Sequence, residues 1–375
     1  MHKTETIGER FAASGGYTAG FGYLRIGLAV AVLCWHSIWI SGAAELDRAI
    51  WSGPFRFLPA AVIPMFFALS GFLVASSLQR SKLHQFVILR IIRIVPALAV
   101  EIALSALILG AAFTTLPLAD YFTAKDFYAY FLNIVGIVHF ELPGVFADNA
   151  APKLINAQLW TIPFELECYL ALIVLSVTAL LGRRALFLGL IVLLSFALAW
   201  LSYLNPMPQE LETNVSGRVL VLSFLAAVSL FLYRDKIPCS TSWAIASLIA
   251  SIVLLPIPAT SYLAVFPLAY LTVWLGLRRP SAIPFGDLSY GVYLFHFPIE
   301  QTVMHVFPGV HAWWLLTLIA LPVTAAFAWL SWTLVEGPIL SRKKDILAQV
   351  DRLLAMLAKP FDRSPRGASS TPQRA

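Results

Sequence analysis

Long apolar segments separated by short polar connections run through most of this chain, from about residue 20 to about residue 335. In hydrocarbon a helix satisfies its own backbone hydrogen bonds, whereas a transmembrane barrel needs short alternating strands, which this sequence does not show. The pattern therefore predicts an all-α polytopic transmembrane helix bundle of about ten spanning helices. The expected spans are residues 20–41, 57–79, 86–112, 159–181, 185–203, 217–233, 241–257, 260–277, 286–307 and 312–335.

The connections between these spans differ in basic residues. If the amino terminus lies inside, the cytoplasmic connections contain Arg80 and Lys82, Arg183 and Arg184, Arg234 and Lys236, Arg278 and Arg279, and Arg342 to Lys344. The opposite connections contain only scattered basic residues. Because cytoplasmic loops are enriched in Lys and Arg, we expect both termini to be cytoplasmic in a multi-pass protein of the inner (plasma) membrane.

The apolar segment from Asp126 to Phe140 does not fit this scheme as a span, because it is short and would invert every later basic connection. We expect it to be a re-entrant or interfacial segment buried against the bundle. The outer loop that follows it is a reasonable place for a substrate to dock.

The chain divides into three expected regions. Residues 1–19 form a cytoplasmic N-terminal segment, residues 20–338 the transmembrane domain, and residues 339–375 a cytoplasmic amphipathic stretch and a tail. The tail, from Pro360, is rich in Ser, Pro and Arg and is expected to be disordered.

Composition supports lipid as the main solvent, since 59% of the residues are hydrophobic and only 12% are charged. The net charge of +6 is explained by the basic cytoplasmic loops, and we find no nucleic-acid motif. The three cysteines show no paired spacing, so neither a disulfide framework nor a metal site is expected. The expected partners therefore include membrane lipid and exclude nucleic acid.

Ionisable residues at membrane depth are candidates for function because each one is costly unless paired or hydrated. On the first span, Arg25 and His36 are eleven residues apart, which places them on one face with His36 roughly 16 Å further out. Taken alone, a snorkelling arginine and a core histidine are an equally good interpretation.

The third and fourth spans contribute further candidates. Arg90 and Arg93 share a face at the cytoplasmic end, where two guanidiniums suit a phosphate-bearing ligand, although positive-inside anchoring explains each one singly. Glu165 and Glu167 point about 160° apart on a helix, so only one is expected to face a site. Glu165 lies at about the depth of His36, and a carboxylate is the natural partner that orients a histidine base.

In the ninth span, Tyr293, His296 and Glu300 fall on one helix face. A packing histidine bonded to a neighbouring carbonyl is at least as good an interpretation of His296 as a catalytic role. Glu336, at the inner end of the last span, is expected to reach water.

Six short segments together resemble the integral-membrane acyltransferase family 3, the envelope O-acyltransferases, over nearly all of residues 17–340. They are Tyr23-Leu24-Arg25 with Trp35-His36-Ser37; Phe66 to Leu73; the Arg90/Arg93 pair before Pro96; Trp160 to Tyr169; Leu288-Ser289-Tyr290 through His296-Phe297-Pro298; and Glu336-Gly337-Pro338.

The resemblance implies a ten-helix bundle in which residues 20–338 are the acyltransferase domain. It implies transfer of an acyl group, with acetyl from cytoplasmic acetyl-CoA as the expected donor, to a hydroxyl of an envelope or exported carbohydrate or glycolipid. By resemblance, Arg25, Arg90 and Arg93 handle the acyl donor and His36 is the catalytic histidine. Relatives often have two adjacent acids in the fourth-helix motif; here Leu166 follows Glu165, so Glu165 is the retained catalytic acid.

Several alternatives stay open. His36 either acts as general base on the acceptor hydroxyl or accepts the acyl group itself in a relay. Trp160, Tyr293 and His296 either line the site or pack the helices. A transporter or flippase for an envelope glycan or lipid would also have intramembrane Arg, His and Glu, whereas a scaffold gives no reason for them. Within the enzyme class, succinyl or a longer acyl chain is an alternative to acetyl.

Overall fold

Apolar helices dominate the computed structural model, which describes residues 5–206, 215–281 and 286–357. Within these ranges, β-structure is limited to three isolated bridges, so the prediction of an all-α fold is confirmed. The tail expected to be disordered, from Pro360 onward, lies outside the described residues.

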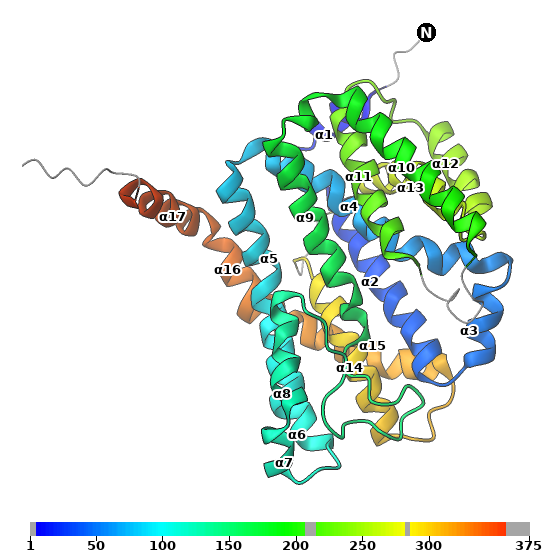
Figure 1. Cartoon of the computed structure of the whole chain (residues 1–375), viewed down its shortest axis with the longest axis vertical. Coiled ribbons are helices and arrows are strands. Elements are labelled where there is room, and N and C mark those ends of the chain that lie inside the picture. Colours follow the sequence, from blue (N-terminus) through cyan, green and yellow to red (C-terminus); the bar gives the residue numbers. More distant parts are fainter. Residues whose placement is uncertain (1–4, 207–214, 282–285, 358–375) are drawn as a thin grey trace, which may run out of the picture.

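The helices form one elongated bundle (Figure 1). In chain order they are α1 (Ile7–Ala12), α2 (Ala19–Ile40), α3 (Ala44–Trp51), α4 (Phe57–Arg80), α5 (Leu83–Leu104), α6 (Gly110–Phe113), α7 (Leu118–Thr123), α8 (Lys125–Tyr130), η4 (Ala157–Thr161), α9 (Ile162–Val177), α10 (Arg184–Leu204), α11 (Gly217–Leu232), α12 (Thr241–Leu254), α13 (Ser261–Gly276), α14 (Ser289–Val306), α15 (Trp313–Ser331), α16 (Gly337–Ser341) and α17 (Lys343–Leu357).

A helix lies over each of the ten expected spans, and six helices are long and apolar enough to cross a membrane. These six are Ala19–Ile40, Pro54–Arg80, Leu83–Phe113, Ala157–Val177, Arg184–Leu204 and Trp313–Ser341. Three further apolar helices, α11, α12 and α13, are shorter. The chain is therefore a multi-pass membrane protein, while the count of ten spans and the cytoplasmic termini stay predictions.

The centre of the bundle is formed by α2, α4, α11, α13 and α14, with α4 packed against α11 and α13, and α14 against α2 and α15. By contrast, α10 exposes large apolar side chains such as Leu193 and Trp200. A helix that is apolar on its outer face is suited to lipid contact, so α10 lies at the periphery of the bundle.

The segment from Asp126 to Phe140 does not cross as one helix. Its two helical pieces, α8 and the following turn Phe131–Val135, are 6 and 5 residues long, and the turn packs against α5. Tyr130 and Asn133 are buried there. The short helices α6, α7 and α8 gather at one end of the bundle, at the bottom of Figure 1.

The loop after this segment is tied to α14. Gln301 donates through Nε2 to the carbonyls of Ala151 and Leu154, at 2.6 and 2.8 Å, and Asn149 donates back to Gln301. These bonds are buried or partly buried, and they fix the loop beside the C-terminal half of α14, whose middle carries the histidine described next.

Candidate active site

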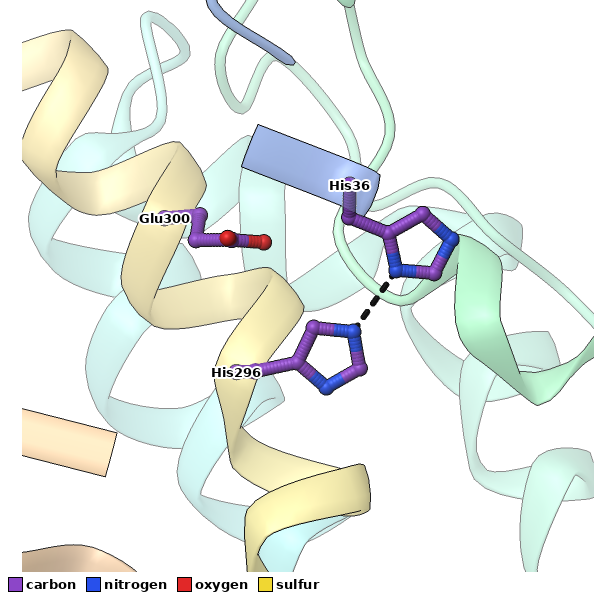
Figure 2. A group of neighbouring side chains, drawn as sticks. All are labelled: His36, His296 and Glu300. Atoms are coloured by element: carbon purple, nitrogen blue, oxygen red, sulfur yellow. Dashed lines mark hydrogen bonds between the residues drawn. The ribbon is translucent and has the colours of Figure 1, made fainter. Parts of the chain in front are cut away.

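Two histidines from helices far apart in sequence meet where α2 contacts α14. Nδ1 of His36 lies 2.7 Å from Nε2 of His296, and the two ring planes differ by only 4° (Figure 2). His296 is fully buried, whereas His36 is partly exposed. The pair therefore forms one in-plane hydrogen bond between an interior ring and a more accessible one.

The surroundings of His296 determine the direction of this bond. Its Nδ1 faces the backbone carbonyls of Tyr293, at 2.8 Å, and Val292, at 3.2 Å. Carbonyls only accept hydrogen bonds, so the proton of neutral His296 resides on Nδ1 and its Nε2 is an acceptor. His36 must then donate from Nδ1, which leaves the lone pair on His36 Nε2 available for chemistry.

A proline in α14 explains how the helix is joined to the start of the fourth span. Pro298 has no N–H, so the carbonyl of Leu294, four residues earlier, lacks its usual helical donor. Gln158 of η4 supplies one through Nε2 at 2.8 Å. The Tyr293 hydroxyl donates to the Gln158 carbonyl at 2.6 Å, so η4 is fixed beside the histidine pair.

Glu300 lies one turn beyond His296 on α14 and is fully buried. Its Oε1 accepts from the hydroxyl of Ser37, the neighbour of His36, at 2.5 Å, while Oε2 has no hydrogen-bond partner in the described part of the chain. The Ser37–Glu300 bond is a second connection between α2 and α14 next to the histidines.

His36, His296 and Glu300 place one possible ligand atom each within 4.8 Å of one another, so they are candidates for a metal site. However, two nitrogens on one tetrahedral zinc ion lie about 3.3 Å apart, given Zn–N bonds near 2.0–2.1 Å. The 2.7 Å separation of His36 and His296 instead fits an N–H···N hydrogen bond. We therefore interpret the group as a hydrogen-bonded pair beside a buried carboxyl group.

A cavity of about 480 Å³ lies next to this pair. Its lining includes all three arginines predicted to handle a donor, together with Glu165 and Tyr293. Tyr293 also contacts the His296 ring, at 6.0 Å between centroids, while neither histidine lines the cavity itself. The cavity therefore approaches the histidine pair from the side of Tyr293.

Two of the three arginines meet over a shared carboxylate. Asp287, just before α14, accepts from Arg25 Nη1 at 2.9 Å and from Arg93 Nη2 at 2.8 Å. Arg93 also pairs with Glu336 at 3.1 Å. The expectation that Glu336 reaches water was wrong, because its side chain is only 3% exposed and compensates the charge of Arg93.

Arg90 differs from its two neighbours, because its guanidinium lies over the rings of Phe86 and Tyr169, at 5.7 and 5.8 Å, rather than against a carboxylate. These cation–π contacts hold the guanidinium at the cavity wall. No ion pair to Arg90 is found among the described residues, so it can donate to an incoming anion without exchanging a partner.

The two acids of the fourth-helix motif point to different sides of the helix, as their spacing predicts. Glu165 faces the cavity and accepts from the Tyr169 hydroxyl, whereas Glu167 pairs with Arg218 at the surface, 2.5 Å away. Within the described chain, no hydrogen bond joins Glu165 to His36. The hydrogen-bond partner of His36 there is His296 instead of the expected carboxylate, because α14, and not α9, packs against this part of α2.

Trp160 packs against Phe164, with ring centroids 5.9 Å apart, and does not line the cavity. Of the three residues expected as possible lining, only Tyr293 lines it directly. Asp287 was missed as a site residue, although an acid near the start of an expected span, with no Lys or Arg on its own helix, is a signal that could have identified it.

Comparisons with known proteins agree with this architecture. Residues 18–333 match the family described as Acyltransferase domain. The chain is 29% identical over 372 residues to "Nodulation protein 10" of Rhizobium leguminosarum bv. viciae, covering 90% of this chain and 97% of that protein. It is 26% identical over 356 residues to "O-acetyl transferase" of Shigella phage Sf6, covering 88% and 98%.

No solved structure matches the chain significantly. The family match nevertheless covers nearly the whole helical bundle, including both histidines, the three arginines and most of the residues that line the cavity. The chain therefore belongs to the acyltransferase family 3 and is an O-acyltransferase.

Proposed function

We propose that this O-acyltransferase moves an acetyl group from cytoplasmic acetyl-CoA to a hydroxyl of an envelope or exported carbohydrate. The observation that carries the proposal is the His36–His296 pair beside a cavity lined by Arg25, Arg90 and Arg93. The cavity has cationic walls suited to phosphates, and the pair supplies a base whose tautomer is fixed.

For the donor, Arg90 is the arginine most ready to meet a phosphate, because its guanidinium has no carboxylate partner among the described residues. Arg25 and Arg93 are neutralised by Asp287 and Glu336, so a donor phosphate would either add to this cluster or replace a carboxylate. The pantetheine arm of acetyl-CoA would then extend past Tyr293 towards His36.

The chemistry requires one proton to move twice. His36 Nε2 takes the proton of the acceptor hydroxyl as its oxygen forms a bond to the thioester carbonyl carbon. When the carbon–sulfur bond breaks, the proton returns from His36 to the departing thiolate of CoA. His296 Nε2 accepts from His36 Nδ1–H throughout, so the imidazolium that forms between the two steps is stabilised and does not rotate.

The alternative mechanism is a two-step relay, in which His36 itself carries the acyl group. His36 Nε2 then attacks the thioester carbonyl carbon and CoA leaves as the thiolate. The acceptor hydroxyl next attacks the acyl carbon, the bond from that carbon to Nε2 breaks, and the hydroxyl proton passes through His36 to the CoA thiolate. Trapping of an acyl group on His36 under single-turnover conditions would support the relay, and its absence would favour the base mechanism.

The position of one loop and the names of the two relatives support a carbohydrate as the acceptor. The loop tied to α14 through Gln301 covers the end of the bundle nearest the histidine pair and offers a docking face for a carbohydrate or glycolipid. One relative is an O-acetyl transferase and the other a nodulation protein, names that are compatible with modification of a carbohydrate. We place the protein in the inner (plasma) membrane, with succinyl as the alternative acyl group.

The proposal is tested in membrane vesicles that contain the protein and acetyl-labelled acetyl-CoA. Label should pass into envelope glycan with the wild type and not with His36→Ala at matched protein levels. If no acyl donor loses its label to an acceptor while a glycan or lipid still crosses the membrane, the transporter alternative replaces the proposal.

A further inference from the structure

Basic side chains outnumber acidic ones in the lining of the cavity, and the three arginines of the sequence motifs are only some of these basic residues. Its lining contains five basic side chains, those of Arg25, Arg80, Arg90, Arg93 and Lys343, and one acidic side chain, that of Glu165. Such an excess inside one concave surface attracts a ligand with several negative charges.

The five cations fall into two groups. Arg25 and Arg93 are ion-paired, and Arg90 lies over aromatic rings. Arg80 and Lys343 have neither arrangement: in the described ranges no carboxylate lies within ion-pairing distance of either one, and both are exposed. Their charges are therefore available to a ligand from solution.

Their places in the chain locate them at the mouth of the cavity. Arg80 is the last residue of α4, Lys343 is the first residue of α17, and the neighbouring lining residues Gly16 and Tyr17 precede α2. All four come from helix ends or connections, whereas Arg90 and Arg93 come from within α5. The cavity thus has a cationic mouth and a cationic middle.

The guanidinium of Arg80 lies against Gly16 at this mouth. A Cβ atom on Gly16 would lie 2.5 Å from Arg80 Nη1, so the guanidinium packs directly on the glycine backbone. The φ of +83° at Gly16 also favours glycine. The absence of a side chain at Gly16 therefore leaves the space that the Arg80 guanidinium occupies, and the backbone conformation there favours glycine.

Building on the proposed function, we propose that Arg80 and Lys343 bind the 3′-phosphate of the CoA donor. CoA has two phosphate centres, a diphosphate adjoining the pantetheine arm and a phosphate on the ribose at its far end. With the arm directed towards His36, Arg90 meets the diphosphate in the middle of the cavity and the mouth pair meets the 3′-phosphate. Arg supplies a forked donor and Lys a point charge, a combination suited to a phosphate dianion.

The test compares acetyl-CoA with acetyl-3′-dephospho-CoA, which lacks only the phosphate in question. Dissociation constants are measured on purified protein in nanodiscs for the wild type, Arg80→Ala, Lys343→Ala and the double variant. The wild type should bind acetyl-CoA about ten- to a hundredfold more tightly than the dephospho form. The double variant should lose this preference by weakening acetyl-CoA binding alone.

Matched variants separate the subsite from general effects. Arg184→Ala removes another exposed basic residue, at the start of α10 and away from the cavity, and should keep the preference. Arg80→Lys should keep most of it. Unchanged affinity of each variant for the dephospho donor shows that the variant is folded.

The outcomes distinguish the inference from the function on which it rests. Wild type that binds both donors equally, or a double variant that weakens both donors equally, overturns the 3′-phosphate subsite and leaves acetyl transfer standing. Wild type that binds neither donor overturns the proposed function and the subsite together.

Discussion

His36 donates through Nδ1 to Nε2 of His296 across 2.7 Å, and the backbone carbonyls around His296 leave no other direction for that bond. A second imidazole thus occupies the place that a carboxylate holds in many histidine-dependent enzymes. Unlike a carboxylate, a neutral imidazole orients the base without adding a negative charge to a buried site.

The first prediction concerns His296 as a positioning residue. His296→Ala should lower kcat by about ten- to a thousandfold while the KM for acetyl-CoA changes little, because it removes the acceptor that fixes the His36 tautomer. His296→Gln, which keeps an acceptor, should recover part of the loss. Steady-state kinetics with His311→Ala as the control for an exposed histidine checks this, and an unchanged kcat in His296→Ala would refute it.

The second prediction concerns Gln158 and Pro298. Gln158→Leu should destabilise the protein by about 1–3 kcal/mol and reduce activity, since the buried carbonyl of Leu294 loses its donor. Pro298→Ala restores a backbone N–H to that carbonyl, so in the Gln158→Leu background it should recover part of the stability. Thermal unfolding of the two single variants and the double variant measures the coupling, and strictly additive effects would count against it.

The third prediction concerns the shared carboxylate of Asp287. Asp287→Asn should lower stability by about 1–3 kcal/mol, because two partly buried guanidiniums lose their common acceptor. Arg25→Ala combined with Asp287→Asn should cost less than the sum of the two changes. A double-mutant cycle in detergent tests this, with no coupling as the contrary result.

The fourth prediction distinguishes the role of Glu165 from that of His36. Since Glu165 is the one acidic side chain among the described residues that line the cationic cavity, Glu165→Gln should leave the KM for acetyl-CoA unchanged or lower it, and should change kcat by less than about tenfold. A fall in kcat comparable to that of His36→Ala would instead make Glu165 part of the chemistry, as the sequence motif suggests.

The fifth prediction concerns the docking of α17. Asp351 accepts from His84 at 2.6 Å and from Gln85 at 2.9 Å, and chiefly the bond from His84 holds the pKa of Asp351 below its ordinary value. A carboxyl with a lowered pKa contributes stability above its ordinary pKa and loses it as pH falls through the lowered value. The protection factors of the α17 amides, corrected for the intrinsic exchange rate at each pH, should therefore fall at acidic pH, and Asp351→Asn should show the lower protection already at neutral pH.

The sequence predicted the helices well because apolar runs in lipid have a required length. The expected range 185–203, for example, corresponds to Arg184–Leu204. The segment after Asp126 was likewise correctly excluded as a span, since a short apolar run cannot cross hydrocarbon as a helix.

Which helices touch could not be predicted in the same way. Periodicity places His36 and Arg25 on one face of α2. It does not predict that α14 brings His296 to His36. Nor does it predict that Asp287 bridges Arg25 to Arg93. For the same reason Glu336 was wrongly expected in water, because its burial depends on Arg93 from another helix.

The most direct test of the central role of His36 is a single-turnover measurement with acetyl-labelled acetyl-CoA bound in advance at equal occupancy to wild type and His36→Ala. We expect both proteins to hold the donor, and we expect transfer of label to the glycan to be slower in the variant by at least about a hundredfold. Transfer at the wild-type rate by a variant that lacks the imidazole would contradict it.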